Sequence, residues 1–162
     1  MLNTKTGVFR VYTTKAGDPT TLDRSSSYAI FKDREARIWV TSMSGVNLYN
    51  REEDNFTRIR DLGSWIMDID QDADGNIWFS SQGNGLFKYD PDKQEWTNYV
   101  HSSAPGALIN DQVNCVLIDG NGEMWIGTMN GLCKYNAKED QFELIPLDIP
   151  SRNILSLIHI SE

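Results

Sequence analysis

The stretch from Asp119 to Tyr135 reads DGNGEMWIGTMNGLCKY, and it decides the fold. Turn-forming residues precede Met-Trp-Ile-Gly-Thr, and a second turn, Met-Asn-Gly, precedes Leu-Cys-Lys-Tyr. Glycine accepts a positive φ, aspartate caps a turn through its own side chain, and short β-branched and aromatic runs favour strands. Extended to both sides, this pattern predicts four strands, at 113–118, 124–128, 131–136 and 141–145.

The same pattern occurs twice more. The chain reads DADGNIWFSSQGNGLFKY from Asp72 to Tyr89 and DREARIWVTSMSGVNLY from Asp33 to Tyr49. Trp39, Trp78 and Trp125 are 39 and 47 residues apart, near the roughly 40–45 residues that are typical of propeller blades. A lone blade cannot bury both sheet faces, so neighbouring blades stack, and the tryptophan suits that interface. The sequence therefore predicts an all-β fold, a partial β-propeller made of four-stranded antiparallel blades.

The repeats also divide the chain. Three near-complete blades are expected at 22–60, 61–100 and 108–147. Residues 1–14 match the last strand of a preceding blade, and residues 151–162 match the start of a further one, although the sequence departs from the repeat after Ile158. Because a closed propeller has typically about 4–8 blades, we expect a segment of a larger ring.

Composition narrows the classes of partner. The 162 residues include 15 basic and 23 acidic ones, which gives a net charge of −8. This charge argues against nucleic acid and against direct contact with an anionic membrane, although it also serves solubility alone. No stretch approaches the roughly 18 apolar residues of a membrane span, and the N-terminus lacks the apolar core of a signal peptide. The two cysteines, Cys115 and Cys133, are interpreted as small buried apolar groups.

Catalytic and metal-binding patterns are weak. Residues 70–76 read DQDADGN, like the first half of a calcium-binding loop, but the twelfth position is Ser81 and strands flank the segment. A turn common to all blades explains it better. His101 and His159 belong to no catalytic pattern. We therefore expect no metal, no cofactor and no catalytic residue, with a propeller lyase or hydrolase as the less favoured alternative, since an acid pair need only converge in space.

A binding role has more support. In a propeller, the loops that enter the first strand and those between the second and third strands share one face. Trp65 stands at the start of a first strand, where the other copies have polar residues. Aromatic faces beside amides and charges suit a sugar ring, whereas packing of Trp65 against a neighbouring blade is the alternative. The candidate ligand-binding residues on this face are Arg60, Trp65, Gln82, Asn84, Asn110, Asp111, Gln112 and Asn130.

The motifs at Asp119–Tyr135 and Asp72–Tyr89 resemble the two-component regulator propeller repeat, and the resemblance extends from Leu2 to about Ile158. The first copy departs from it at Ala36, where the turn glycine belongs. The resemblance implies a periplasmic sensor region of a bacterial hybrid histidine kinase, often two seven-bladed propellers followed by a small β-domain and a membrane span. Many such regulators sense oligosaccharides.

The function implied by this resemblance is ligand sensing on the extracytoplasmic side of a membrane-anchored parent. Its expected partners are an oligosaccharide or other small molecule and the remaining blades of the propeller. Any kinase activity would lie outside these residues, so this segment itself is expected not to be an enzyme. A protein-interaction scaffold, including a homodimer, is the alternative.

Overall fold

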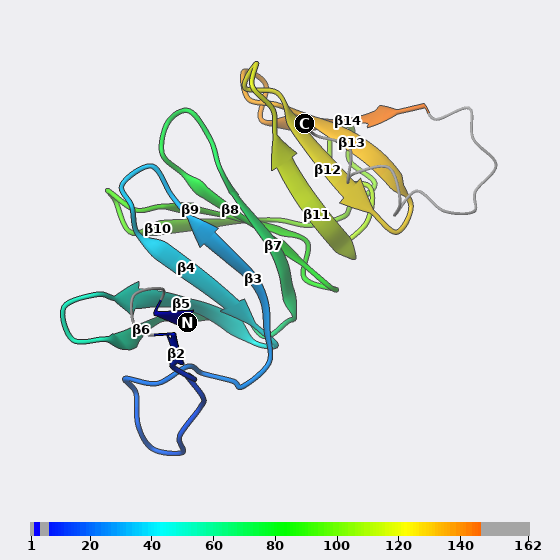
Figure 1. Cartoon of the computed structure of the whole chain (residues 1–162). Helices are drawn as coiled ribbons and strands as arrows, with labels where there is room; N and C mark the ends of the chain where they lie inside the picture. The colour runs from blue at the N-terminus through cyan, green and yellow to red at the C-terminus, as the bar shows by residue number, and fades with distance from the viewer. Residues whose placement is uncertain (1, 4–6, 147–162) are drawn as a thin grey trace. The chain divides into compact units, whose positions relative to one another are not determined.

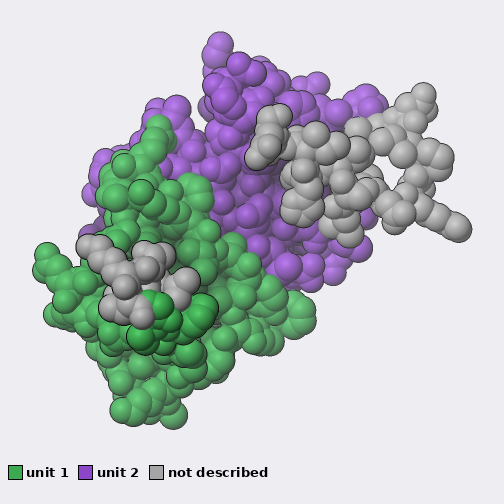
Figure 2. Space-filling view, in the orientation of Figure 1, with its two compact units in different colours: residues 1–66 green, residues 67–162 purple. Residues whose placement is uncertain are grey.

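The structure is a computed structural model that describes residues 2–3 and 7–146, with side chains described from residue 7 onward. The described residues form strands and turns and contain no helix. The chain divides into two compact units, residues 1–66 and 67–162, which Figure 2 shows in different colours. Unit 1 contains one four-stranded sheet and one two-stranded sheet, and unit 2 contains two four-stranded sheets apart from the first residue of β7.

Three four-stranded antiparallel sheets follow one another along the chain (Figure 1). Blade 1 consists of β3 (Ser27–Lys32), β4 (Ile38–Ser42), β5 (Gly45–Asn50) and β6 (Asn55–Asp61). Blade 2 consists of β7 (Ile66–Gln71), β8 (Ile77–Ser81), β9 (Leu86–Asp90) and β10 (Glu95–Tyr99). Blade 3 consists of β11 (Val113–Ile118), β12 (Met124–Thr128), β13 (Gly131–Asn136) and β14 (Gln141–Ile145). The strands of each blade pair in chain order, which confirms the all-β prediction.

The strands of blade 3 coincide with the ranges predicted from the sequence. The predicted ranges 61–100 and 108–147 each enclose one sheet, and the range 22–60 encloses the first sheet except for Asp61, the last residue of β6. Residue 147 and the predicted start of a further blade at 151–162 lie outside the described residues. The division of the whole chain into consecutive blades of one incomplete ring stays a prediction.

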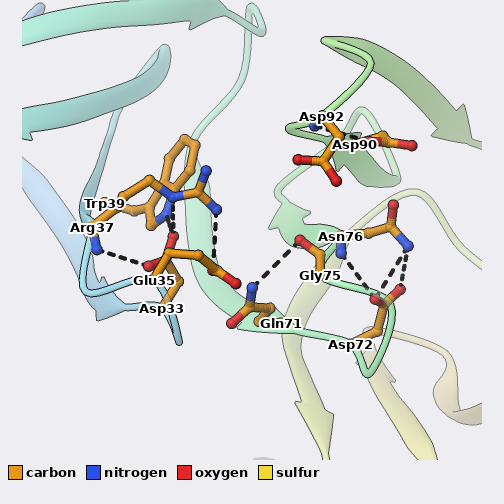
Figure 3. A network of polar contacts seen from close by, with 10 residues as sticks. All are labelled: Asp33, Glu35, Arg37, Trp39, Gln71, Asp72, Gly75, Asn76, Asp90 and Asp92. Carbon is orange, nitrogen blue, oxygen red and sulfur yellow. Dashed lines mark hydrogen bonds and ion pairs between the residues drawn. The ribbon is translucent and has the colours of Figure 1, made fainter.

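The aspartate that opens each repeat closes a turn and anchors the repeated tryptophan. In blade 2, the Asp72 carboxylate accepts hydrogen bonds from the Asn76 backbone N–H at 2.9 Å and from Trp78 Nε1 at 2.8 Å. In blade 1, the Asp33 carboxylate accepts them from the Arg37 backbone N–H at 2.8 Å and from Trp39 Nε1 at 2.7 Å (Figure 3). One carboxylate therefore satisfies both the turn and the indole N–H.

Blade 3 repeats this arrangement. The Asp119 carboxylate accepts the Glu123 backbone N–H at 2.9 Å and also bonds the Trp125 side chain. These hydrogen bonds, led by the one from Glu123, hold the pKa of Asp119 below its usual value. Asp119 is thus a structural anion, because the bonds favour its charged form.

The turn itself keeps its shape in blade 1 although a glycine is missing. Ala36 has a φ of 64°, close to the 90° of Gly75 in blade 2. Ala36 N donates to Asp33 O at 3.0 Å, as Gly75 N donates to Asp72 O at 3.1 Å. The alanine therefore adopts the left-handed conformation at a cost of about 1–2 kcal/mol.

Within unit 2, blades 2 and 3 pack face to face around the repeated tryptophan. Trp78 is fully buried, stacks on Tyr99 with ring centroids 5.5 Å apart, and meets Tyr135 edge-on at 5.1 Å. Trp78 and Leu86 of blade 2 join a single apolar cluster with blade 3 residues Val113, Val116, Met124, Ile126, Cys133 and Phe142. For Trp78, this confirms the prediction that the tryptophan packs between blades.

The repeated glycine at the start of the third strand allows the backbone of the fourth strand to approach. A Cβ on Gly85 would lie 2.0 Å from the carbonyl oxygen of Tyr99, and one on Gly45 would lie 2.2 Å from that of Arg60. Both contacts are with backbone, so the strands would have to separate to admit any side chain. Glycine at this point is a packing requirement of blades 1 and 2.

Two carboxylates of β7 reach the first strand of the next blade. Asp68 Oδ2 accepts the backbone N–H of Val116 at 3.2 Å, and Asp70 Oδ2 accepts that of Ile118 at 2.6 Å. Burial raises the pKa of Asp68, outweighing its backbone hydrogen bonds. β11 is an edge strand of its sheet, so these carboxylates bond its otherwise unpaired edge.

The N-terminal segment forms a short hairpin, β1 (Leu2–Asn3) with β2 (Val8–Phe9). Its register pairs Leu2 with Phe9, just as β13 and β14 pair Tyr135 with Phe142. The hairpin therefore has the pairing of a third and fourth strand. That residues 1–14 form the last strand of a preceding blade stays a prediction.

Candidate functional site

A charged pocket opens at the loop end of blade 1. This end is defined by the register, because Ser27 pairs with Ser42 and Gly45 pairs with Asp61. The pocket has a volume of about 260 Å³. Its lining residues are Asp23, Arg24, Ser44, Val46, Arg58, Arg60 and Asp61.

Asp23 is held rigidly at this pocket. Its Oδ2 accepts hydrogen bonds from the hydroxyls of Ser42 at 2.6 Å and Ser44 at 2.7 Å, and its Oδ1 accepts one from Asn47 Nδ2 at 2.6 Å. Burial disfavours the charged form, but these three hydrogen bonds, together with one from the backbone of Arg24, outweigh it and lower the pKa of Asp23. The pocket thus carries a fixed anion at neutral pH.

The arginines of the pocket differ in role. Arg58 braces the loop before blade 1, since it donates to the carbonyl oxygens of Asp18 at 2.9 Å and Thr21 at 3.1 Å. Arg24 and Arg60 are exposed at the pocket. Guanidinium groups only donate hydrogen bonds and ionised carboxylates only accept them. Together they complement a ligand rich in hydroxyl groups, which do both.

An exposed aromatic pair lies at the same end of unit 1. Trp65, just before β7, stacks on Tyr28 of β3 with ring centroids 6.0 Å apart and planes inclined by 19°. Trp65 is 46% exposed and Tyr28 is 39% exposed. Trp65 therefore packs against a neighbouring blade, as one interpretation of the sequence expected, and still offers aromatic surface to solvent.

The loop end of unit 2 is lined by amides. Gln82 forms an isolated bridge with Gln112, and Gln82 Nε2 donates to Asn114 Oδ1 at 3.0 Å. Asn114 Nδ2 also lies 3.5 Å from the sulfur of Met129, which is 57% exposed. The amide side chain of Gln82, in a loop of blade 2, thus meets that of Asn114, in β11 of blade 3.

The loop that enters blade 3 is held by its own polar residues. Asp111 Oδ1 accepts the backbone N–H of His101 at 2.6 Å, and Asn110 Oδ1 accepts that of Gln112 at 2.7 Å. The Asp111 carbonyl oxygen accepts the backbone N–H of Gly85 at 2.9 Å. Asn110 and Asp111 therefore shape the loop.

The structure sorts the eight candidate residues into two groups. Arg60 and Trp65 belong to unit 1, and the other six, Gln82, Asn84, Asn110, Asp111, Gln112 and Asn130, belong to the loop end of unit 2. Ligand binding by any of them stays a prediction. Sequence reasoning missed the neighbouring residues Asp23, Arg24, Tyr28 and Asn114. Of these, only Tyr28 and Asn114 lie in strands, at equivalent positions of β3 and β11. A polar or aromatic residue at this position in two blades is a weak sequence signal for a site.

The calcium-like segment serves the fold. Asp72 anchors its turn and Trp78, and Asp70 bonds the backbone of β11. In the part of the chain that is described, no three His, Cys, Asp or Glu residues gather as a metal site would require. Burial raises the pKa of the Cys115 thiol to about 11. The expectation that the segment has no catalytic residue stays a prediction.

Comparison with known proteins identifies the repeat. Residues 107–130 match the family described as "Two component regulator propeller". No curated protein sequence matches the chain. The matched residues include β11 and β12, so blade 3 carries the repeat of this family.

Solved structures share the fold. One is the extracellular domain of BT3049 from B. thetaiotaomicron, assigned as a hybrid two component system, at 24% identity and a TM-score of 0.73, covering 88% of this chain and 20% of that one. A second is the corresponding domain of BT4673 from the same organism, at 23% identity and a TM-score of 0.65, covering 85% and 18%. The chain thus spans about a fifth of the length of these domains.

A third similar structure is an enzyme. Virginiamycin B lyase from Staphylococcus aureus matches at 17% identity and a TM-score of 0.62, covering 83% of this chain and 44% of the lyase. At these identities the likeness establishes a common propeller fold. Among the described residues, no helix has the length and apolar character needed to cross a membrane.

Proposed function

We propose that this chain, a propeller segment with a two component regulator propeller repeat at residues 107–130, belongs to the extracytoplasmic sensor of a hybrid two-component regulator and recognises an oligosaccharide. The repeat and the shared fold with two extracellular domains of such systems support the sensor assignment. The segment contributes binding surface, and signalling by phosphoryl transfer belongs to other parts of a parent protein.

The observation that carries the ligand proposal is the chemistry of the loop end of unit 1. There an exposed stacked pair, Trp65 on Tyr28, accompanies a pocket that presents Asp23, Arg24 and Arg60. An aromatic face suits the C–H face of a sugar ring, while carboxylate and guanidinium groups suit its hydroxyls. A pocket of about 260 Å³ fits one ring of an oligosaccharide better than a larger ligand.

The test is a glycan-array screen of the full chain, followed by isothermal titration with each oligosaccharide that binds. We expect Trp65→Ala to weaken binding by roughly five- to tenfold, because an aromatic contact contributes on the order of 1–1.5 kcal/mol. Arg24→Ala should weaken it by a similar factor. Neither residue is buried, so both variants should keep the circular dichroism spectrum of the unchanged chain.

Leu144→Ala is the matched control, since Leu144 is 54% exposed but lies outside the loop-end pocket, in β14. It should bind as the unchanged chain does. The proposal fails if no glycan binds, or if Trp65→Ala and Leu144→Ala affect binding equally.

A further inference from the structure

One face of blade 1 repeats, position by position, the face that blade 3 buries against blade 2. Ile38, Val40, Tyr49 and Phe56 of blade 1 occupy the repeat positions of Met124, Ile126, Tyr135 and Phe142 of blade 3. The equivalence extends to the backbone. Phe56 N donates to Thr20 O at 2.9 Å, and Phe142 N donates to Gly106 O at 2.7 Å.

The aromatic side chains on the two faces share one geometry. Tyr12 lies 5.9 Å from Tyr49 at an interplanar angle of 67°, and Tyr99 lies 5.9 Å from Tyr135 at 66°. In each case both tyrosine hydroxyls donate to one aspartate, Asp54 on blade 1 and Asp140 on blade 3. The outer part of the blade 1 face is thus already built by the chain's own N-terminal segment.

The inner part differs sharply between the two blades. On blade 3 it is filled by Trp78 and Leu86, and Val116 is only 3% exposed. On blade 1 the equivalent residue, Ile30, is 73% exposed. A pocket of about 270 Å³ lies there, lined by Tyr12, Ile30, Ile38, Val40, Tyr49 and Phe56. Tyr12 and Tyr49 flank it as Tyr99 and Tyr135 flank the Trp78 indole.

We propose that this pocket receives the indole of a tryptophan on the second strand of a further propeller blade, whose outer hairpin is β1–β2. The hairpin pairs Leu2 with Phe9 in the register of a third and fourth strand. The proposed occupant would therefore supply the inner strands of that blade. A complete blade of a second copy does not fit, because it would bring its own fourth strand to the place that Tyr12 holds.

The test extends the full chain at its N-terminus. A copy of residues 66–88 is joined directly to Leu2, so that Leu2 takes the place of Tyr89 and the copied Trp78 can reach the pocket. Burial of this indole should raise the thermal unfolding midpoint by about 6 °C or more over that of the unextended chain. The tryptophan emission maximum of the extended chain should lie at a shorter wavelength than that of an equimolar mixture of the unextended chain and the free segment.

Two variants give matched controls. Trp78→Ala within the copied segment only should abolish most of the rise. Ile30→Lys should remove the rise from the extended chain but leave the unextended chain's midpoint nearly unchanged, because Ile30 is exposed there. The proposal is overturned if the segment with Trp78→Ala stabilises equally. It is also overturned if the unextended chain sediments as a dimer that Ile30→Lys dissociates, since a second copy would then be the occupant.

Discussion

The hydrogen bond between Asp72 and Trp78 should couple the turn of blade 2 to its packing against blade 3. The Asp72 carboxylate accepts four hydrogen bonds, from the backbone N–H groups of Asp74 and Asn76, from Asn76 Nδ2 and from Trp78 Nε1. The Trp78 side chain is fully buried, so loss of this partner leaves its indole N–H without access to water.

We expect Asp72→Ala to lower the free energy of unfolding by about 3–5 kcal/mol. A hydrogen bond to a charged group contributes roughly 1.5–3 kcal/mol, and the orphaned indole N–H accounts for most of this range. The exposed Asp74 N–H can bond water instead and adds little. Trp78→Phe removes the same hydrogen bond from the other side, together with part of the indole's volume, and should cost about 2–3 kcal/mol.

A double-mutant cycle separates the hydrogen bond from these other effects. Urea unfolding of the four proteins, followed by circular dichroism, should give a coupling energy of about 1.5–3 kcal/mol between Asp72→Ala and Trp78→Phe. The same cycle on Asp72 and Tyr89, which the carboxylate does not bond, is the control. Additivity of the Asp72 and Trp78 changes to within about 0.5 kcal/mol would refute the reasoning.

Three further outcomes are expected. Gly75→Ala should lower the free energy of unfolding in urea by about 1 kcal/mol, because φ is 90° there, although no atom lies within 4 Å of the added Cβ. Ala36→Gly should instead raise the free energy of unfolding slightly. If both substitutions changed it in the same direction, the strain at Ala36 would be contradicted. Hydrogen bonds from Tyr135 and Tyr99 lower the pKa of Asp140, so Asp140→Asn should destabilise by about 1 kcal/mol at pH 7, and the difference should vanish as pH falls through that pKa. Burial raises the pKa of Asp68, so ionisation of Asp68 lowers the stability of the chain as pH rises through that pKa. Asp68→Asn should therefore stabilise the chain at pH 7 but not at pH 3. If thermal unfolding showed the same effect of Asp140→Asn or Asp68→Asn at both pH values, the pKa shift assigned to that aspartate would be contradicted.

The repeat made most of the fold predictable from the sequence. Each copy combines turn chemistry, a tryptophan and a glycine at fixed spacing, and these local signals agree with the blade. The sequence alone did not predict the shape of the turn at Ala36, since alanine disfavours a positive φ. The Asp33 hydrogen bonds to Arg37 and Trp39 hold that turn in shape, and the cost of one strained residue is smaller than theirs.

The candidate site was less predictable because its residues come together only through folding. Trp65 stood out as a departure from the repeat, but its partner Tyr28 did not, since a tyrosine in a strand is ordinary. Asp23 lies in a loop outside the aligned motif, and only the paired serines and Asn47 reveal it as a fixed anion. Residues that depart from a repeat can be identified as functional candidates from the sequence, whereas the residues that surround them in space are known only from the structure.

The carboxylates of Asp68 and Asp70 also bear on how blade 3 behaves toward other polypeptides. An unpaired edge strand is a template for β-augmentation and for aggregation. Because side chains occupy the N–H groups of Val116 and Ile118, an extended peptide cannot add to that stretch of β11 without displacing them. Two aspartates thus give this edge a protection that proline or a charged bulge supplies in other sheets.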